Sequence, residues 1–343
     1  MLLDNNDSLA SAYSPEQRLI QSVVQGSDPT IASPIGLAER LLGLPMARLE
    51  STTPYSSLNN NGSPLQVCIS YREAAQQVRL IVDPDAVTPI SSIRLSKAKK
   101  VLESHLQRSE ADSLFAVWLR DSVNHWIPDD CHERTLASGY FWLGTDLEQR
   151  GTALYLSPHW QSTETQWRHL TQWLNYFGID PKGVVKNLGQ HARLASIALE
   201  GRSSTESKLK VYWRLGSEFN LADQPHPLFQ DKKIKSFLQH SIGSKSLSTN
   251  GLLLSMCWNL SSCEIEEVKI DICGHCLNHK PSEWQALLGR LSKCFGFSSP
   301  ITAPYFSVGA DIAFISLALD VSRKSRFNIY WKPGVSGEGY AAD

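Results

Sequence analysis

Five segments of this chain have the sequence of a β-hairpin, and they recur at a nearly constant spacing. They cover residues 65–84, 138–158, 193–216, 252–272 and 311–333. Successive hairpins begin roughly 55 to 75 residues apart with helical sequence between them, which is typical of a repeat architecture. Short polar turns such as 200–207 and 322–325 join the two strands of a hairpin, so the pairing should be antiparallel, which excludes a (β/α)₈ barrel. Five such hairpins predict a closed sheet.

Polar and apolar residues alternate along the second strand of each hairpin. In the third hairpin Lys208, Lys210 and Tyr212 fall on one face, and Leu209 and Val211 fall on the other. The polar face of the other hairpins carries similar side chains: Arg79, Tyr155, Lys269, Asp271, Arg326, Asn328 and Tyr330. If the intervening helices cover the apolar face, the polar face must turn inward, in a barrel wide enough to hold a ligand.

The predicted fold is therefore α+β: a closed antiparallel barrel of about ten strands, built from repeated ααββ units with the helices outside. A single domain should span residues 1–343, with N-terminal helices over 1–60, the repeat barrel over 61–333 and a mobile tail over 334–343. Helical spacing of apolar residues predicts helices at 14–25, 34–49, 96–107, 110–123, 162–177, 231–241 and 282–295. Ser282 and Gln285 suggest a capping box at the start of the last one.

Composition limits the class of protein. A net charge of −1 and a pI of about 6.8 argue against a nucleic-acid partner, which would require a basic excess. Seven cysteines without regular spacing favour reduced thiols over a disulfide framework. The N-terminal segment is acidic where a signal peptide would be basic, and we find no long apolar run. We expect a cytoplasmic protein with no membrane partner.

The inward-facing side chains predict an anion site. Aligning the second strands on their exits places Tyr155, Tyr212 and Tyr330 at one level, together with Asp271. The preceding inward positions hold Ala153, Lys210, Lys269 and Asn328, followed by Arg79, Lys208 and Arg326. Ammonium and guanidinium groups beside phenols suit a diphosphate, and tyrosine rings can shield a carbocation. A solvated strand face is the simpler alternative for one hairpin. Repetition in several hairpins favours a site for ionisation of an allylic diphosphate.

These residues resemble the aromatic prenyltransferases of the ABBA, or PT-barrel, fold, from about Asn60 onward. That family includes dimethylallyltryptophan synthases, bacterial indole prenyltransferases and cyanobactin peptide prenyltransferases. KLKVYW fits its basic-x-Lys-x-Tyr strand at Lys208, Lys210 and Tyr212, and TALYLSP and FNIYWKP resemble its Tyr-x-x-Pro strand ends. QVRLIVDP places Arg79 at its diphosphate arginine.

The resemblance implies a transferase that moves a prenyl group, dimethylallyl or longer, from an allylic diphosphate to an indole or phenol. The acceptor would be a small metabolite or a peptide side chain, as in indole alkaloid or modified-peptide biosynthesis. The diphosphate would be held by Arg79, Lys208, Lys210, Lys269 and Arg326, and the cation would be shielded by Tyr155, Tyr212 and Tyr330. A catalytically silent barrel that binds an anionic or aromatic ligand is the alternative.

Three positions depart from the family pattern. Gln66 stands where a glutamate is common, Ala153 replaces a lysine and Asp271 replaces a tyrosine. An amide cannot act as a general base near neutral pH, so we expect Gln66 to orient the acceptor and Asp271 or an ordered water to take its proton. Asp271 could also help to hold a Mg²⁺, or could form a buried ion pair with Lys269 or Lys210.

Two other clusters carry ligand-type residues. Cys273, His275, Cys276 and His279 have the chemistry of a zinc site without its usual spacing, so a strand end followed by a loop is the preferred interpretation. His125, Asp129, Asp130 and His132 fit an exposed loop. The chain contains no glycine-rich phosphate loop and no nucleophile elbow. Trp142 and Trp258 could line the lumen, but we expect both to pack in the core.

Overall fold

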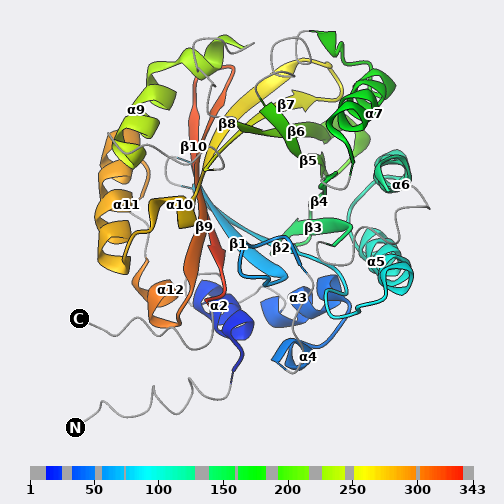
Figure 1. Ribbon diagram of the computed structural model, residues 1–343, viewed down its shortest axis with the longest axis horizontal. Helices are drawn as coiled ribbons and strands as arrows, with labels where there is room; N and C mark the ends of the chain where they lie inside the picture. Colours follow the sequence, from blue (N-terminus) through cyan, green and yellow to red (C-terminus); the bar gives the residue numbers. More distant parts are fainter. Residues whose placement is uncertain are drawn as a thin grey trace.

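A closed barrel of ten antiparallel strands forms the centre of the computed structural model (Figure 1). The structure describes residues 13–24, 33–50, 56–72, 75–127, 139–158, 161–182, 192–215, 226–243, 251–298 and 302–334. The strands are β1 (Leu65–Arg72), β2 (Ala75–Val82), β3 (Phe141–Asp146), β4 (Thr152–Leu156), β5 (Ala192–Gly201), β6 (Lys208–Leu215), β7 (Leu252–Asn259), β8 (Ile265–Cys273), β9 (Asp311–Asp320) and β10 (Ser325–Lys332). Each strand pairs with its sequence neighbours, and β1 pairs with β10 to close the ring. The five predicted hairpins and the predicted fold class are confirmed.

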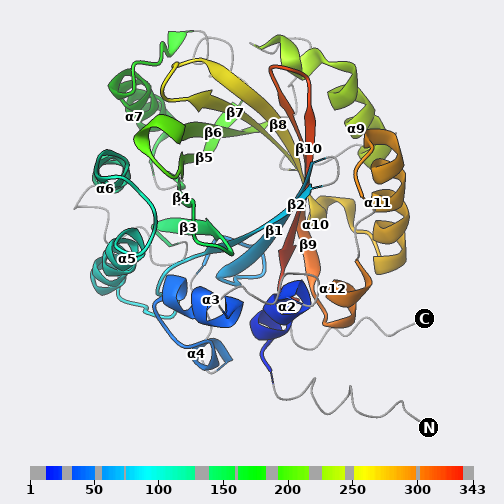
Figure 2. The same ribbon diagram turned by 180° about the vertical axis from the view of Figure 1, so that it is seen from behind.

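Helices lie outside the ring in both views (Figures 1 and 2). They are α2 (Pro15–Val24), α3 (Pro34–Leu42), α4 (Ala47–Glu50), α5 (Ser91–Leu106), α6 (Ser113–Trp126), α7 (Thr163–Tyr176), α9 (Lys232–Ile242), α10 (Gly274–Leu277), α11 (Pro281–Phe295) and α12 (Ala303–Ser307). The proposed tail after Gly334 lies outside the described residues.

Several helix predictions were wrong in detail. Helix α5 begins at Ser91, five residues before its predicted start, and α6 lies three residues later than predicted. The helix predicted over 34–49 is two helices, because Gly43 ends α3 in the left-handed conformation with φ 70° and Pro45 follows. Helix α11 begins at Pro281, whose fixed φ suits the first helical position. The cap is therefore not at Ser282. Instead, the backbone N–H of Lys280 donates to the Glu283 carboxylate at 2.8 Å.

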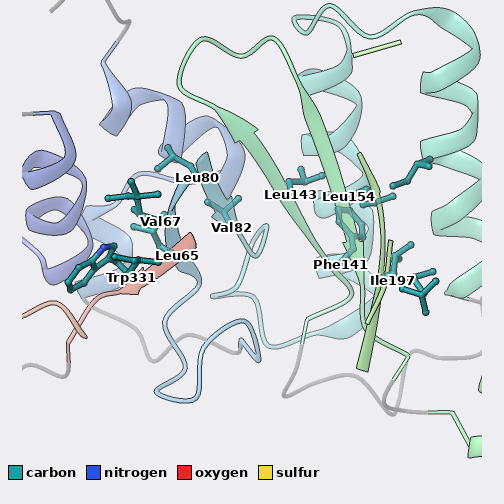
Figure 3. Packing of buried hydrophobic residues seen from close by; sticks show 14 of the residues in the cluster. Leu65, Val67, Leu80, Val82, Phe141, Leu143, Leu154, Ile197 and Trp331 are labelled. Carbon is teal, nitrogen blue, oxygen red and sulfur yellow. The ribbon is translucent and has the colours of Figure 1, made fainter. Parts of the chain in front are cut away.

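The apolar face of every hairpin packs against the helices. Leu209, Val211 and Trp213 of β6 are fully buried in this outer core, and Phe327, Ile329 and Trp331 of β10 are buried there in the same way. Figure 3 shows part of this layer, where Val67, Leu80 and Val82 cluster on strands β1 and β2. Because side chains alternate along a strand, burying this face outward turns the polar face into the lumen.

The two ends of the barrel are built differently. Each odd-numbered strand runs into its even-numbered partner through a short turn, and all five turns lie at one end of the barrel. The helices connect one hairpin to the next at the other end. We call these the turn end and the helix end.

Candidate active site

Three cavities follow one another inside the barrel. The first, of about 370 Å³, lies toward the helix end and is walled by Trp142, Tyr155, Tyr212, Phe314 and Tyr330. We call it the aromatic chamber. The second, of about 540 Å³, lies at the turn end and is lined mostly by charged and amide side chains. We call it the polar chamber.

A narrow neck of about 10 Å³ lies between the two chambers. It shares Tyr155, Tyr212, Lys269 and Tyr330 with the aromatic chamber, and it shares Arg79, Lys210 and Arg326 with the polar chamber. Lys210, Tyr212, Lys269 and Tyr330 therefore all face one central cavity, as the strand register predicts. The candidate diphosphate and tyrosine residues meet at this neck, with the exception of Lys208, which lines the polar chamber only.

Carboxylates pair with all five of the candidate diphosphate-binding cations. Glu200 accepts from both Arg79 and Lys210 at 2.6 Å, and Glu267 accepts from Arg326. Lys269 pairs with Asp271 at 2.8 Å, and Lys208 pairs with Glu266 at 2.8 Å. The Lys208 side chain is 33% exposed, against 8% for Lys210. The neck is thus a desolvated cation layer with its own counter-ions, and Lys208 lies at its wetter margin.

The ionisable side chains of the neck keep their charges because oppositely charged groups lie beside them. Burial alone would lower the pKa of Lys210 and of Lys269, but the nearby carboxylates Glu200 and Asp271 outweigh it, so both pKa values are raised. Burial would raise the pKa of Glu200, but Arg79 and Lys210 hold it well below its usual range. Both lysines and Glu200 therefore remain ionised near neutral pH.

The tyrosines of the neck stay neutral and surround a cation. Burial raises the pKa of Tyr212 and of Tyr330 well above that of free tyrosine, so both keep their protons and can donate hydrogen bonds. Lys269 Nζ lies 4.9 Å from the centre of the Tyr212 ring and 5.3 Å from that of Tyr330, and it donates to the Tyr330 hydroxyl at 3.2 Å. The ring faces already stabilise one positive charge at this place.

Arg79 reaches its partner across two other strands. It lies on β2 and Glu200 lies on β5, a separation of about 14 Å at three strand spacings. The inward positions between them are Gly144 and Ala153, which pair with each other. A Cβ at Gly144 would lie 3.2 Å from the Tyr155 ring and 3.5 Å from Arg79 Cδ, closer than usual packing to Tyr155. Small residues on β3 and β4 therefore leave the path along which Arg79 enters the neck.

Asp271 faces the aromatic chamber with one oxygen unoccupied. Its Oδ1 pairs with Lys269, and its Oδ2 is buried and makes no hydrogen bond to the residues that the structure describes. Of the two ion pairs proposed for Asp271, the one with Lys269 is the one formed. Because Oδ2 has almost no accessible surface, the carboxylate would have to turn slightly before it could accept a proton from a group in the chamber.

Gln66 is fixed by a neighbouring amide. It is buried in the wall of the aromatic chamber, and its Nε2 donates to Asn59 Oδ1 at 3.0 Å. Asn59 Nδ2 in turn donates to the carbonyl oxygens of Ser63 at 2.9 Å and Leu65 at 2.8 Å. Because these two carbonyls only accept, Asn59 must present its oxygen to Gln66, and the Gln66 carbonyl oxygen remains for another partner.

The structure corrects the predicted levels of Tyr155 and Asp271. Tyr155 pairs with Ala198, and Ala198 pairs with Lys210, so Tyr155 is in register with Lys210 and not with Tyr212. Tyr212 pairs with Ser255, and Ser255 pairs with Lys269, so Lys269 and not Asp271 is in register with Tyr212. Asp271 is in register with Arg214, through Leu253. Aligning strands on their exits fails here because tilted barrel strands are staggered.

Sequence reasoning also missed or misplaced several residues of the lumen. Trp142 lines the aromatic chamber and, like Tyr155 and Tyr330, packs against the small cluster of Leu58, Cys68 and Ile81. Trp258 is buried in the outer core as expected. Glu200 and Glu267 were missed, although Glu267 precedes Lys269 by two residues and so shares its inward face. Arg193 and Arg214 line the aromatic chamber and were also missed as site residues.

The other candidate clusters form no metal site in the part of the chain that the structure describes, where no group of three or more His, Cys, Asp or Glu is placed to bind one. Cys273 is buried at the end of β8, where burial raises the pKa of its thiol to about 12. His125 stacks on Trp173 at 5.3 Å, and Asp129, Asp130 and His132 lie outside the described residues.

Among the described helices, none has both the length and the apolar run that a bilayer span requires.

The sequence matches no known family profile, and no curated protein is similar to it in sequence. Solved structures resemble it closely in shape. A 5-dimethylallyl tryptophan synthase from Streptomyces coelicolor, in complex with DMASPP and Trp, is 16% identical with a TM-score of 0.75, over 98% of this chain and 96% of that one. A 6-dimethylallyltryptophan synthase from Micromonospora olivasterospora, in complex with the same ligands, is 16% identical with a TM-score of 0.74, over 94% and 98%. PriB, in a complex with product diphosphate, is 15% identical with a TM-score of 0.74, over 97% of both chains.

The chain has the fold of these proteins. The ABBA, or PT-barrel, architecture predicted from the sequence is therefore confirmed for nearly the whole chain.

Proposed function

We propose that this protein is an aromatic prenyltransferase. It moves a dimethylallyl or longer prenyl group from an allylic diphosphate to an electron-rich aromatic acceptor, an indole or a phenol, free or within a peptide. The observation that carries the proposal is the neck, where buried cations and neutral tyrosines separate a polar chamber from an aromatic one. The structural neighbours support it, because they were solved with diphosphate or with DMASPP and Trp.

The neck supplies the ionisation step. Arg79, Lys210 and Arg326 bind the diphosphate oxygens, which take over hydrogen bonds now given to Glu200 and Glu267. Lys269 and Lys208 add positive charge on either side. The bond between the allylic carbon and oxygen breaks with its electron pair going to the diphosphate, whose developing charge the cations stabilise.

The aromatic chamber supplies the second step. Tyr155, Tyr212 and Tyr330 line both the neck and the chamber, so their ring faces shield the allyl cation from water. A π bond of the acceptor ring attacks that cation and forms the new bond to carbon. The ring then loses its proton to Asp271 Oδ2, and the amide of Gln66 orients the acceptor.

A direct assay tests this function. The protein is incubated with dimethylallyl diphosphate and a panel of L-tryptophan, indole, phenols and aromatic peptides, and products are examined by mass for the gain of one prenyl unit. We expect a product with at least one acceptor. If diphosphate and an aromatic both bind and no acceptor gains the prenyl unit, the protein is the silent ligand-binding barrel instead.

Substitutions at Gln66 separate orientation from proton transfer. We expect Gln66→Ala to retain measurable prenyl transfer and to alter acceptor preference or the position of attachment, because the amide orients and does not titrate. Product mass and regiochemistry, compared with the parent enzyme, are the readouts. Loss of transfer with normal binding of both ligands would show that Gln66 takes part in the chemical step.

Gln66→Glu is the matched variant of nearly the same shape. Its carboxylate would face Asn59 Oδ1, and Asn59 cannot turn without losing its bonds to the carbonyls of Ser63 and Leu65. This buried carboxylate should have a raised pKa, which suits a general base. We expect unchanged diphosphate affinity and equal or faster transfer to indoles.

A further inference from the structure

The polar chamber is much larger than the neck beside it. It has a volume of about 540 Å³ and reaches from the neck to the turn end, where it is bordered by the ends of β1 and β2 and by the turn after β5. Arg72 and Gln76 from β1 and β2, and Arg202 and Glu206 from the turn after β5, are all exposed. The chamber therefore reaches solvent at this rim, and at its inner end it reaches Arg79, Lys210 and Arg326.

Its lining suits a small hydrophilic anion. Six cations, Arg72, Arg79, Arg202, Lys208, Lys210 and Arg326, face four carboxylates, Asp146, Glu200, Glu206 and Glu267. The cations form a series from the exposed rim, through the half-buried Lys208, to the neck. Among the residues that the structure describes, no aromatic side chain lines this chamber, in contrast to the aromatic chamber. A prenyl tail or an aromatic ring would find less apolar surface here than in the aromatic chamber.

We propose that the polar chamber is the route by which inorganic diphosphate leaves the neck, so that the two products leave through opposite ends of the barrel. This inference rests on the proposed function. Once the carbon–oxygen bond has broken, the diphosphate lies between the prenylated acceptor in the aromatic chamber and the free polar chamber behind it. The row of cations offers it successive partners toward solvent, and by reversibility the same route admits inorganic diphosphate as an inhibitor.

Charge reversal at the rim tests the route. The association rate constant of radiolabelled inorganic diphosphate is measured by rapid filtration at low salt, for the parent and for Arg72→Glu/Arg202→Glu. We expect association to slow about tenfold, by an amount that shrinks as salt is added, because long-range steering is screened. Arg72→Lys/Arg202→Lys, which keeps the charge, should behave as the parent.

Two further variants make the test specific. Arg168→Glu/Arg290→Glu reverses two exposed arginines on the outer helices α7 and α11 and controls for total charge. Ala195→Trp obstructs the aromatic chamber, which Ala195 lines, and should leave diphosphate association within twofold of the parent.

The route is overturned if the rim variant matches the Arg168/Arg290 control, or if Ala195→Trp slows association more than the rim variant does. The prenyl-transfer assay of the parent is scored separately. If the parent transfers the prenyl unit while the rim variant matches its control, only the exit route is lost. If the parent neither binds inorganic diphosphate nor transfers the prenyl unit, the proposed function is lost together with the route.

Discussion

Asp271→Asn is expected to slow prenyl transfer to a carbon acceptor by at least about 100-fold while inorganic diphosphate binds as well as before or more tightly. General bases typically contribute 10² to 10⁴ in rate, and among the described residues Asp271 is the carboxylate that lines the aromatic chamber, with an Oδ2 that makes no hydrogen bond. The amide keeps the shape of the side chain and removes one negative charge from the cation layer of the neck. Steady-state transfer rates and calorimetric titration with inorganic diphosphate give the two quantities.

An isotope effect separates the base from a structural role. With an acceptor deuterated at the carbon that is prenylated, proton loss should become rate-limiting in the Asp271→Asn variant and give a primary isotope effect. Glu267→Gln is the matched control, because it also removes a buried carboxylate paired with a cation, on the polar side of the neck. We expect it to cost less than tenfold in transfer and to show no isotope effect. If both variants lose the same factor in transfer rate, Asp271 acts only as a counter-ion and not as a base.

Lys210→Ala should weaken dimethylallyl diphosphate binding by about 2 kcal/mol, roughly 30-fold, with little effect on the aromatic acceptor. Lys210 is nearly buried, so its charge acts through a desolvated site. Glu200 keeps its bond to Arg79 in the variant, so no buried charge is left without a partner and the fold should be retained. Titration of the variant with each ligand gives the two affinities.

Lys208→Ala is the control for Lys210→Ala, because the two lysines are neighbours on one face of β6. Lys208 is one-third exposed and paired with a similarly exposed Glu266, so its removal should cost no more than about 1 kcal/mol. If the two variants weaken diphosphate binding equally, the burial of a lysine does not determine how much it contributes to diphosphate affinity. If Lys210→Ala weakens the acceptor as much as the diphosphate, the loss reflects general damage to the barrel.

The architecture could be predicted because alternation and repetition are local properties. Leu209, Val211 and Trp213 alternate with Lys208, Lys210 and Tyr212, and a register error of one residue would bury all of the charges in the outer core. Five repeats of this pattern admit one arrangement, a ring with its polar face inward. The boundaries of the helices depended on weaker cues, as Gly43 and Pro281 show.

The pairing inside the lumen could not be predicted, because it depends on which strands face each other across the ring. Glu200 lies near the end of β5 and its partner Arg79 lies on β2, and nothing in the sequence around either residue indicates the other. The stagger of tilted strands likewise moved Asp271 out of register with Tyr212. Such contacts follow from the closure of the barrel and not from any one segment.

The turn end and the helix end of the barrel differ in how freely their sequences can change. The difference is between the paired strands and the long connections that join the hairpins. The aromatic chamber takes residues from outside the strands, including Ser57 and Leu58 ahead of β1 and Gln166 on α7. The connections that carry them are long, so they can be lengthened or rewritten while the hairpins keep their pairing. We therefore expect substitutions at the helix end to change acceptor preference without disturbing the cations and carboxylates of the neck. The paired strands are thus the constant part of the barrel, and the connections at the helix end are the part that can vary.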